Sequence, residues 1–117
     1  MLICKDHARF ELKGPMTFQE AVLRLKLAVE AARKKRIAKL LIDVREIEKI
    51  DVPGIGQRYW LVTEMESSAQ GAVKIVMIAR PEFIDHEKVG VTIAANRNLD
   101  MNIFATEADA LAWLLAP

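Results

Sequence analysis

The chain has 117 residues, of which 52% are hydrophobic and 28% charged, so it is neither a disordered tail nor a low-complexity spacer. Lys and Arg number 17 and Asp and Glu 16, and the resulting net charge of +1 gives no overall attraction to nucleic acid or to an anionic membrane. The single cysteine, Cys4, excludes an internal disulfide, and no apolar run reaches the roughly 18 residues that span a bilayer. The first residues turn charged too soon for a signal peptide, so we expect one soluble, cytoplasmic domain over 1–117.

The N-terminal third predicts two strands and a helix. A short apolar run covers 2–4, and apolar and charged residues alternate from 8 to 12 with the period of a strand that has one solvated face. Gly14 and Pro15 end this strand. Thr17 and Glu20 have the spacing of a capping box, and the apolar stripe that follows predicts a helix ending in the basic run 33–36.

The middle of the chain predicts a buried strand and a second helix. The continuous apolar run 39–44 is typical of a strand in a parallel sheet, and 45–49 is expected to be a charged connection. The segment 51–56 should open the helix with Pro53 in its first turn, and 67–71 should close it. We expect four residues of this helix to face the core, namely Ile55, Tyr59, Val62 and Met65.

The last third repeats the alternation. A buried strand at 73–78 leads through Arg80 and Pro81 into a third helix with a stripe of Val89, Ile93 and Asn96, and Asn98 is expected to be left-handed. A short strand at 101–104 and a helix capped by Thr106 follow. The order ββαβαβαβα predicts an α/β fold with a mixed, mostly parallel sheet, in which sites lie beyond the carboxyl ends of the strands.

The usual catalytic, metal and cofactor patterns are missing. No G-x-S-x-G elbow is present, and a metal site would have to combine Cys4, Asp6, His7 and His86, which lack ligand spacing. Gly54 and Gly56 lack the third glycine of a dinucleotide fingerprint, so we expect no catalytic residue, no metal and no cofactor. The basic run 33–36 has no interleaved aromatic residue, which favours a solvated helix end over nucleic-acid binding.

A family resemblance rests on the segment 41–56. The segment contains Leu41-Ile42-Asp43-Val44 and, after six residues that end in Ile50, Asp51-Val52-Pro53-Gly54-Ile55-Gly56. This pattern resembles the STAS domain, the fold of bacterial anti-sigma-factor antagonists. That family has L-x-D-hydrophobic in a strand and D-S-S-G-hydrophobic-G at the next helix. The stretches Asn96–Leu99, Ile103-Phe104 and Ala110–Leu114 resemble the ending of its divergent SpoIIAA-like branch. The element order and the length also agree.

The resemblance implies a non-enzymatic regulatory module that binds a protein. Val52 and Pro53 replace the two serines of the family motif, so neither carries the hydroxyl that a regulatory phosphate needs. The expected partner surface is the turn and the outer face of the second helix, with Trp60 near its boundary. It comprises Asp51, Val52, Pro53, Gly54, Gly56, Gln57, Arg58 and Trp60.

The alternative is a module that binds a lipid or small apolar ligand at the periphery of a membrane, since the divergent branch resembles CRAL-TRIO lipid carriers in fold. The third helix, weakened by Gly90, would be a mobile lid. The expected ligand residues are Asp43, Arg45, Arg80, Phe83, Ile84, Val89 and Ile93. A third hypothesis is an enzyme in which Asp43, Arg45, Asp51 and Arg80 converge. The sequence does not determine the partner, the pathway, whether a homodimer forms through Trp60 or Trp113, or whether the lid moves.

Overall fold

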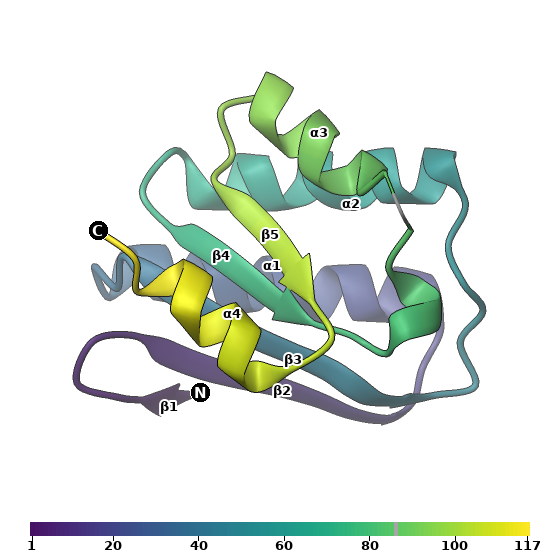
Figure 1. Ribbon diagram of the computed structural model, residues 1–117, viewed down its shortest axis with the longest axis horizontal. Coiled ribbons are helices and arrows are strands. Elements are labelled where there is room, and N and C mark those ends of the chain that lie inside the picture. The colour runs from purple at the N-terminus through teal and green to yellow at the C-terminus, as the bar shows by residue number, and fades with distance from the viewer. Residues whose placement is uncertain (86) are drawn as a thin grey trace.

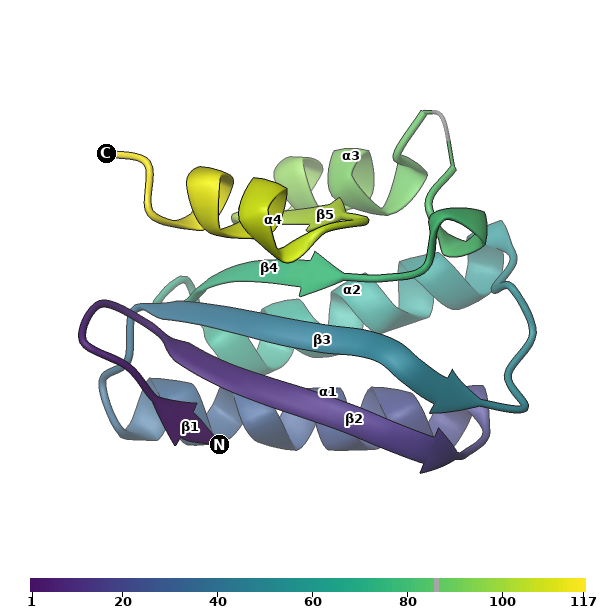
Figure 2. The ribbon, with the colours of Figure 1, turned by 60° about the horizontal axis from the view of Figure 1, so that its bottom comes forward.

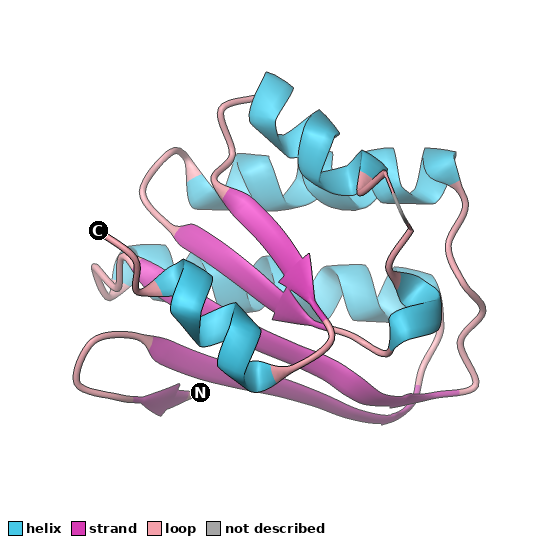
Figure 3. Ribbon diagram, in the orientation of Figure 1, coloured by secondary structure: helices cyan, strands magenta, loops and turns pink. Residues whose placement is uncertain are grey.

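The computed structural model describes residues 1–85 and 87–117 and has a central five-stranded sheet with four α-helices (Figures 1 and 3). The elements in chain order are β1 Leu2–Ile3, β2 Ala8–Pro15, α1 Phe18–Lys34, β3 Lys39–Glu48, α2 Ile55–Ala69, β4 Lys74–Ile78, the 3-10 turn η1 Pro81–Phe83, α3 Val89–Asn96, β5 Met101–Phe104 and α4 Glu107–Leu114. The predicted α/β class and the order of strands and helices are confirmed.

The strands lie side by side in their order along the chain, β1-β2-β3-β4-β5. β1 pairs antiparallel with β2, and every later pair is parallel. Each parallel connection carries a helix, which is how a chain returns to the start of the neighbouring strand. The sheet is therefore mixed and mostly parallel, as the sequence predicts.

The two faces of the sheet are covered unequally. α1, α2 and α3 pack on one face, and α4 crosses the other, so the domain has three layers (Figure 2). The larger core contains Leu40, Ile42 and Ile75 from the strands together with the inner sides of α1 and α2. The smaller core joins Leu41, Val76 and Ile78 to α4. Alternate residues of β3 and β4 thus face opposite layers, and the continuous apolar runs in the sequence follow from burial on both faces.

Local sequence signals explain where α1 begins. The Thr17 hydroxyl accepts a hydrogen bond from the Glu20 amide at 3.1 Å and donates one to the Glu20 carboxylate at 3.2 Å. This arrangement satisfies an amide that the first turn of a helix leaves without a partner. The predicted cap by the Thr17 hydroxyl is confirmed, but the Glu20 carboxylate bonds to that hydroxyl and does not complete a capping box. The left-handed conformation of Asn98, whose φ is 61°, is also confirmed.

The predicted end of the third strand at residue 44 is wrong, because β3 continues to Glu48. The register between β2 and β3 shifts from Glu11 opposite Asp43 to Lys13 opposite Glu46, which places one extra residue in β3. Such a bulge keeps a strand in the sheet while breaking its simple alternation. The charged residues of 45–49 therefore belong partly to a strand, where the pattern indicated a connection.

Several expectations for the second and third helices are also wrong. Ile55 and Tyr59 are 69% and 47% exposed, so the predicted inward stripe is correct only for Val62 and Met65. Gly54 is the N-cap of α2, and Pro53 precedes the helix instead of lying in its first turn. The predicted third helix is divided into η1 and α3. No helix among the described residues is long and apolar enough to cross a membrane.

Candidate functional site

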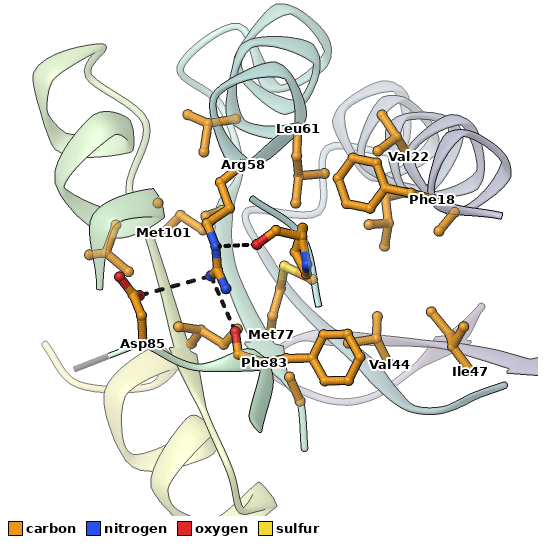
Figure 4. A pocket seen from close by; sticks show the side chains of 18 of the residues that line it. Phe18, Val22, Val44, Ile47, Arg58, Leu61, Met77, Phe83, Asp85 and Met101 are labelled. Carbon is orange, nitrogen blue, oxygen red and sulfur yellow. Dashed lines mark hydrogen bonds and ion pairs between the residues drawn. The ribbon is translucent and has the colours of Figure 1, made fainter. Parts of the chain in front are cut away.

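A largely apolar cavity of about 100 Å³ lies between the sheet and the covering helices, toward the carboxyl ends of the parallel strands (Figure 4). Its walls come from β3, β4, β5, α1, α2, α3 and the segments before α2 and between β4 and α3. Ligands in open α/β folds bind at this edge of the sheet, where successive helices leave space above the strand ends. The position therefore makes the cavity the leading candidate for a binding site.

The apolar walls follow from the same alternation that builds the larger core. Val44 and Ile47 of β3 and Met77 of β4 form the floor, and Phe18 and Val22 of α1 form one side. The β3 bulge lies between Asp43 and Glu46, and the side chains of Val44 and Ile47 both face the larger core. The bulge therefore brings two residues that are three apart in sequence onto the same wall.

Arg58 is the main polar group of the cavity, which corrects its expected position on the outer face of α2. Its side chain is 15% exposed and reaches from α2 toward Phe83 and Asp85 (Figure 4). Nε donates a hydrogen bond to the Pro53 carbonyl and Nη1 donates one to the Phe83 carbonyl, each at 3.2 Å. Nη1 also lies 3.8 Å from the Asp85 carboxylate. Arg58 thus links the turn before α2 to the segment that covers the cavity.

Asp85 connects this arginine to α3. The two oxygens of its carboxylate accept hydrogen bonds from the Val89 amide at 3.3 and 3.2 Å, which caps the start of the helix. Lys88, which also lines the cavity, donates to Asn102 at 2.8 Å and lies over the Phe104 ring. α3 itself buries only Ala94 fully, so its hold on the domain is weaker than that of α1.

The expected partner turn lies at the surface beside this cavity. Asp51, Val52, Gly54 and Gly56 are exposed, Pro53 is half-buried, and Val52 exposes half of its surface. The Gln57 side chain is exposed and accepts a hydrogen bond from the Gly54 amide at 2.9 Å. Trp60 is 38% exposed and packs on Phe18, with 6.0 Å between ring centroids, which agrees with its predicted boundary position. Seven of the eight expected partner residues are therefore near one surface, and Arg58 points inward.

Asp43 and Arg45 lie on the opposite face of the sheet, next to α4, so they cannot line the same cleft as Phe83. Asp43 is 3% exposed and accepts hydrogen bonds from the Arg45 amide, from Arg45 Nε and Nη2, and from Arg9 Nη2, at 2.8 to 3.0 Å. Arg9 also pairs with Glu107 of α4. Burial acts to raise the pKa of Asp43, but the hydrogen bonds and charge of Arg45, with the charge of Arg9, hold that pKa below its ordinary value.

This cluster explains the bulge chemically. The extra residue in β3 disturbs the ladder, and the Asp43 carboxylate accepts the hydrogen bond of the Arg45 amide at that point. The side chain of Arg45 also donates to this carboxylate, and that hydrogen bond raises the pKa of Arg45. Asp51 and Arg80 do not join the cluster, and Arg80 pairs with Glu82 and stacks on Phe83. The four residues of the enzyme hypothesis therefore do not converge.

The expected ligand residues are divided by the structure. Phe83 lines the cavity, whereas Ile84, Val89, Ile93 and Arg80 are not part of its wall. Ile93 instead packs against the larger core. On α3, the wall is formed by Gly90 and Val91, which lie one and two residues after the expected ligand residue Val89. The cavity lies under the third helix, but α3 lines it with Gly90 and Val91 and not with the expected Val89 and Ile93.

The sequence contained a signal for the inward position of Arg58. Arg58, Val62, Met65 and Ala69 follow spacings of four, three and four, which is the pattern of one helix face. A stripe that begins at Ile55 is the more apolar alternative, because an arginine is rarely buried. Among the described residues, no three of His, Cys, Asp and Glu are grouped as metal ligands would be, and His86 lies outside them.

No protein-family model, no curated protein and no solved structure matches the chain. What the molecule does is therefore inferred from its residues and their geometry.

Proposed function

We propose that this protein is a non-enzymatic binding module of STAS type, closest to the SpoIIAA-like branch, that takes a small apolar ligand at the carboxyl ends of its parallel strands. The observation that carries the proposal is the cavity of about 100 Å³ with an almost wholly apolar wall. An engineered protein cavity of about 150 Å³ stays dry and binds benzene, so a space of this kind favours a small apolar group over water. The motif around Asp51, Gly54 and Gly56 and the order of the elements support the assignment to the family.

The covering segment supports entry of a ligand. η1 has no fully buried residue, and α3 has only Ala94. An element that buries few apolar side chains opens at a small fraction of the global unfolding free energy. The cavity can therefore exchange its contents without unfolding of the sheet.

The test is an NMR titration of the whole chain with butan-1-ol. We expect saturable shifts at residues of the cavity wall, for example the methyl groups of Val22, Ile47 and Val91. The variant Ala21→Leu adds three carbons to a buried wall residue and should weaken binding at least fivefold, because it fills part of the space.

The matched control is Ala112→Leu, at an exposed position of α4 on the other face, which should bind butan-1-ol as the wild type does. Both variants are first checked for cooperative unfolding. The proposal fails if the wild type shows no saturable shifts at wall residues, or if Ala21→Leu binds with undiminished affinity.

A second candidate function is docking of a protein partner on the turn before α2. The exposure of Val52 and Ile55, at 50% and 69%, favours it, because large exposed apolar side chains grouped at a turn mark interaction sites. A substitution of Arg58 is unsuitable as a test of docking, because Arg58 also links the turn before α2 to the segment that covers the cavity.

The appropriate variant is Ile55→Glu, which places a negative charge at the start of a helix, where it does not oppose the helix dipole. A partner captured with the wild-type chain is purified and titrated against this variant. Loss of binding of tenfold or more supports docking at the turn. Equal loss with Leu23→Glu, an exposed residue of α1, or no loss with Ile55→Glu, contradicts it.

A further inference from the structure

Two charged groups of the cavity face each other at one end. Among the described residues that line it, only Arg58, Asp85 and Lys88 are ionisable, and they come from α2 and from the segment that covers the cavity. The Lys88 ammonium is held by Asn102 and the Phe104 ring, so the charges that face each other in the cavity are those of Arg58 and Asp85. The Arg58 guanidinium is 15% exposed and has no carboxylate of the described residues within hydrogen-bond distance, and an anion that reached it would compensate a partly buried charge.

The guanidinium of Arg58 has capacity for a further acceptor. An arginine carries five N–H donors, and the structure shows two hydrogen bonds from this one, through Nε and Nη1. The carboxylate of Asp85 lies 3.8 Å from Nη1, which is beyond hydrogen-bond distance. Arg58 therefore faces Asp85 as an ion pair without a direct hydrogen bond, and its remaining donors are free to take a carboxylate in the forked geometry that arginine favours.

The size of the cavity limits the rest of the ligand. About 100 Å³ is less than the 150 Å³ that holds benzene, so a tail of roughly three or four carbons fits beside Phe18, Val44 and Met77. A cavity of this volume thus suits a short amphiphile.

We propose that the ligand is a short-chain carboxylate whose apolar tail fills the cavity and whose carboxylate binds Arg58, on the side of the guanidinium that faces the cavity. This inference rests on the proposed function and names the chemical class of its ligand. The carboxylate competes with Asp85 for the same arginine, so binding loosens the link between Arg58 and the residue that caps α3. The head group of the ligand then influences how firmly the covering segment is held.

The experiment compares three probes with the same four-carbon chain, butanoate, butan-1-ol and butylamine, at pH 7 and constant ionic strength. NMR titration of the wild-type chain should show butanoate binding at least tenfold more tightly than butan-1-ol, because a carboxylate carries the opposite charge and accepts two N–H bonds of the guanidinium, whereas a hydroxyl is neutral. Butylamine should bind more weakly than butan-1-ol, because its ammonium would be repelled by the guanidinium of Arg58. Shifts for butanoate should extend to the Arg58 and Val89 amides.

Two substitutions assign the preference to one side chain. Arg58→Gln should bind butanoate and butan-1-ol within twofold of each other, and Arg24→Gln, at an exposed position of α1, should keep the wild-type preference. If Arg58→Gln does not fold, the comparison of the three probes on the wild type still tests whether the site prefers a carboxylate head group.

Equal affinity of the wild type for butanoate and butan-1-ol, or a preference retained in Arg58→Gln, overturns the head-group assignment and leaves the apolar site standing. Absence of binding by all three probes means that the proposed function itself has failed.

Discussion

Replacing Asp43 by Asn should destabilise the domain without affecting the cavity. Asp43 accepts four hydrogen bonds, three from Arg45 and one from Arg9, and it is 3% exposed. An asparagine keeps one oxygen for the Arg45 amide and Nε. Its NH₂ group, however, meets the Nη2 donors of Arg45 and Arg9, so two charge-assisted hydrogen bonds are lost.

The magnitude follows from those two bonds. A hydrogen bond to a charged group contributes about 1.5–3 kcal/mol, which gives an upper figure of roughly 3–6 kcal/mol for the pair. The side chains of Arg45 and Arg9 are 38% and 23% exposed, so water replaces part of what is lost. We expect a loss of about 2 kcal/mol in the free energy of unfolding, larger than that of most surface substitutions.

The effect should depend on pH in a defined direction. The pKa of Asp43 in the folded chain is lowered, and that of an unfolded aspartate is about 3.9. Stability from the ionised carboxyl is therefore fully present above about pH 4 and is lost as the pH falls through the lower, folded pKa. The difference between wild type and Asp43→Asn should be constant from pH 8 to pH 5 and shrink in more acidic solution.

Equilibrium urea unfolding at several pH values measures both quantities. Asp100→Asn, an exposed position in the loop before β5, serves as control and should change the free energy by less than about 0.5 kcal/mol. Binding of butan-1-ol should be unchanged in Asp43→Asn, because the cluster and the cavity lie on opposite faces of the sheet. A change below 0.5 kcal/mol at pH 7, or a difference that grows toward acid, would refute this account of the cluster.

Two further substitutions test the core and a helix end by urea unfolding. Leu114→Ala, at a fully buried position of α4, should lower the free energy of unfolding by about 3 kcal/mol, because it leaves a cavity between α4 and the sheet. A loss as small as that of Ala116→Gly, at an exposed site, would show that α4 is not packed there. Gln70→Gly should stabilise the domain by about 0.5–1 kcal/mol, because Gln70 ends α2 with a φ of 48°, which glycine adopts without steric cost. Ser67→Gly, one turn earlier, should instead destabilise by about 0.5 kcal/mol, and the same sign in both would contradict the backbone argument.

The sequence was sufficient to predict the order of strands and helices because each element has a strong periodic signal. The alternation in β2, the continuous apolar runs of β3 and β4 and the Thr17 cap are local features, and local features are visible without the fold. The end of β3 was missed because a bulge interrupts its alternation. Only the pairing with β2 and the carboxylate of Asp43 keep residues 45–48 in the sheet.

The candidate site was predicted in part for a similar reason. Its location at the carboxyl ends of the strands follows from the topology, and Phe83, one of the expected ligand residues, lines the cavity there. The inward direction of Arg58 depends on two carbonyl groups and a carboxylate contributed by segments far from it in sequence. Which face of the sheet receives Asp43 and Arg45 depends on where α4 packs, and no local pattern contains that information.

The unequal covering of the sheet has a consequence for biosynthesis. Leu41, Val76 and Ile78 are made long before α4, yet α4 supplies their cover through Ala110 and Leu114. While the ribosome translates the intervening residues, these apolar side chains are exposed on one face of the nascent sheet. Exposed apolar surface of this kind promotes aggregation and binds chaperones. A premature stop codon before position 107 would leave that side permanently uncovered.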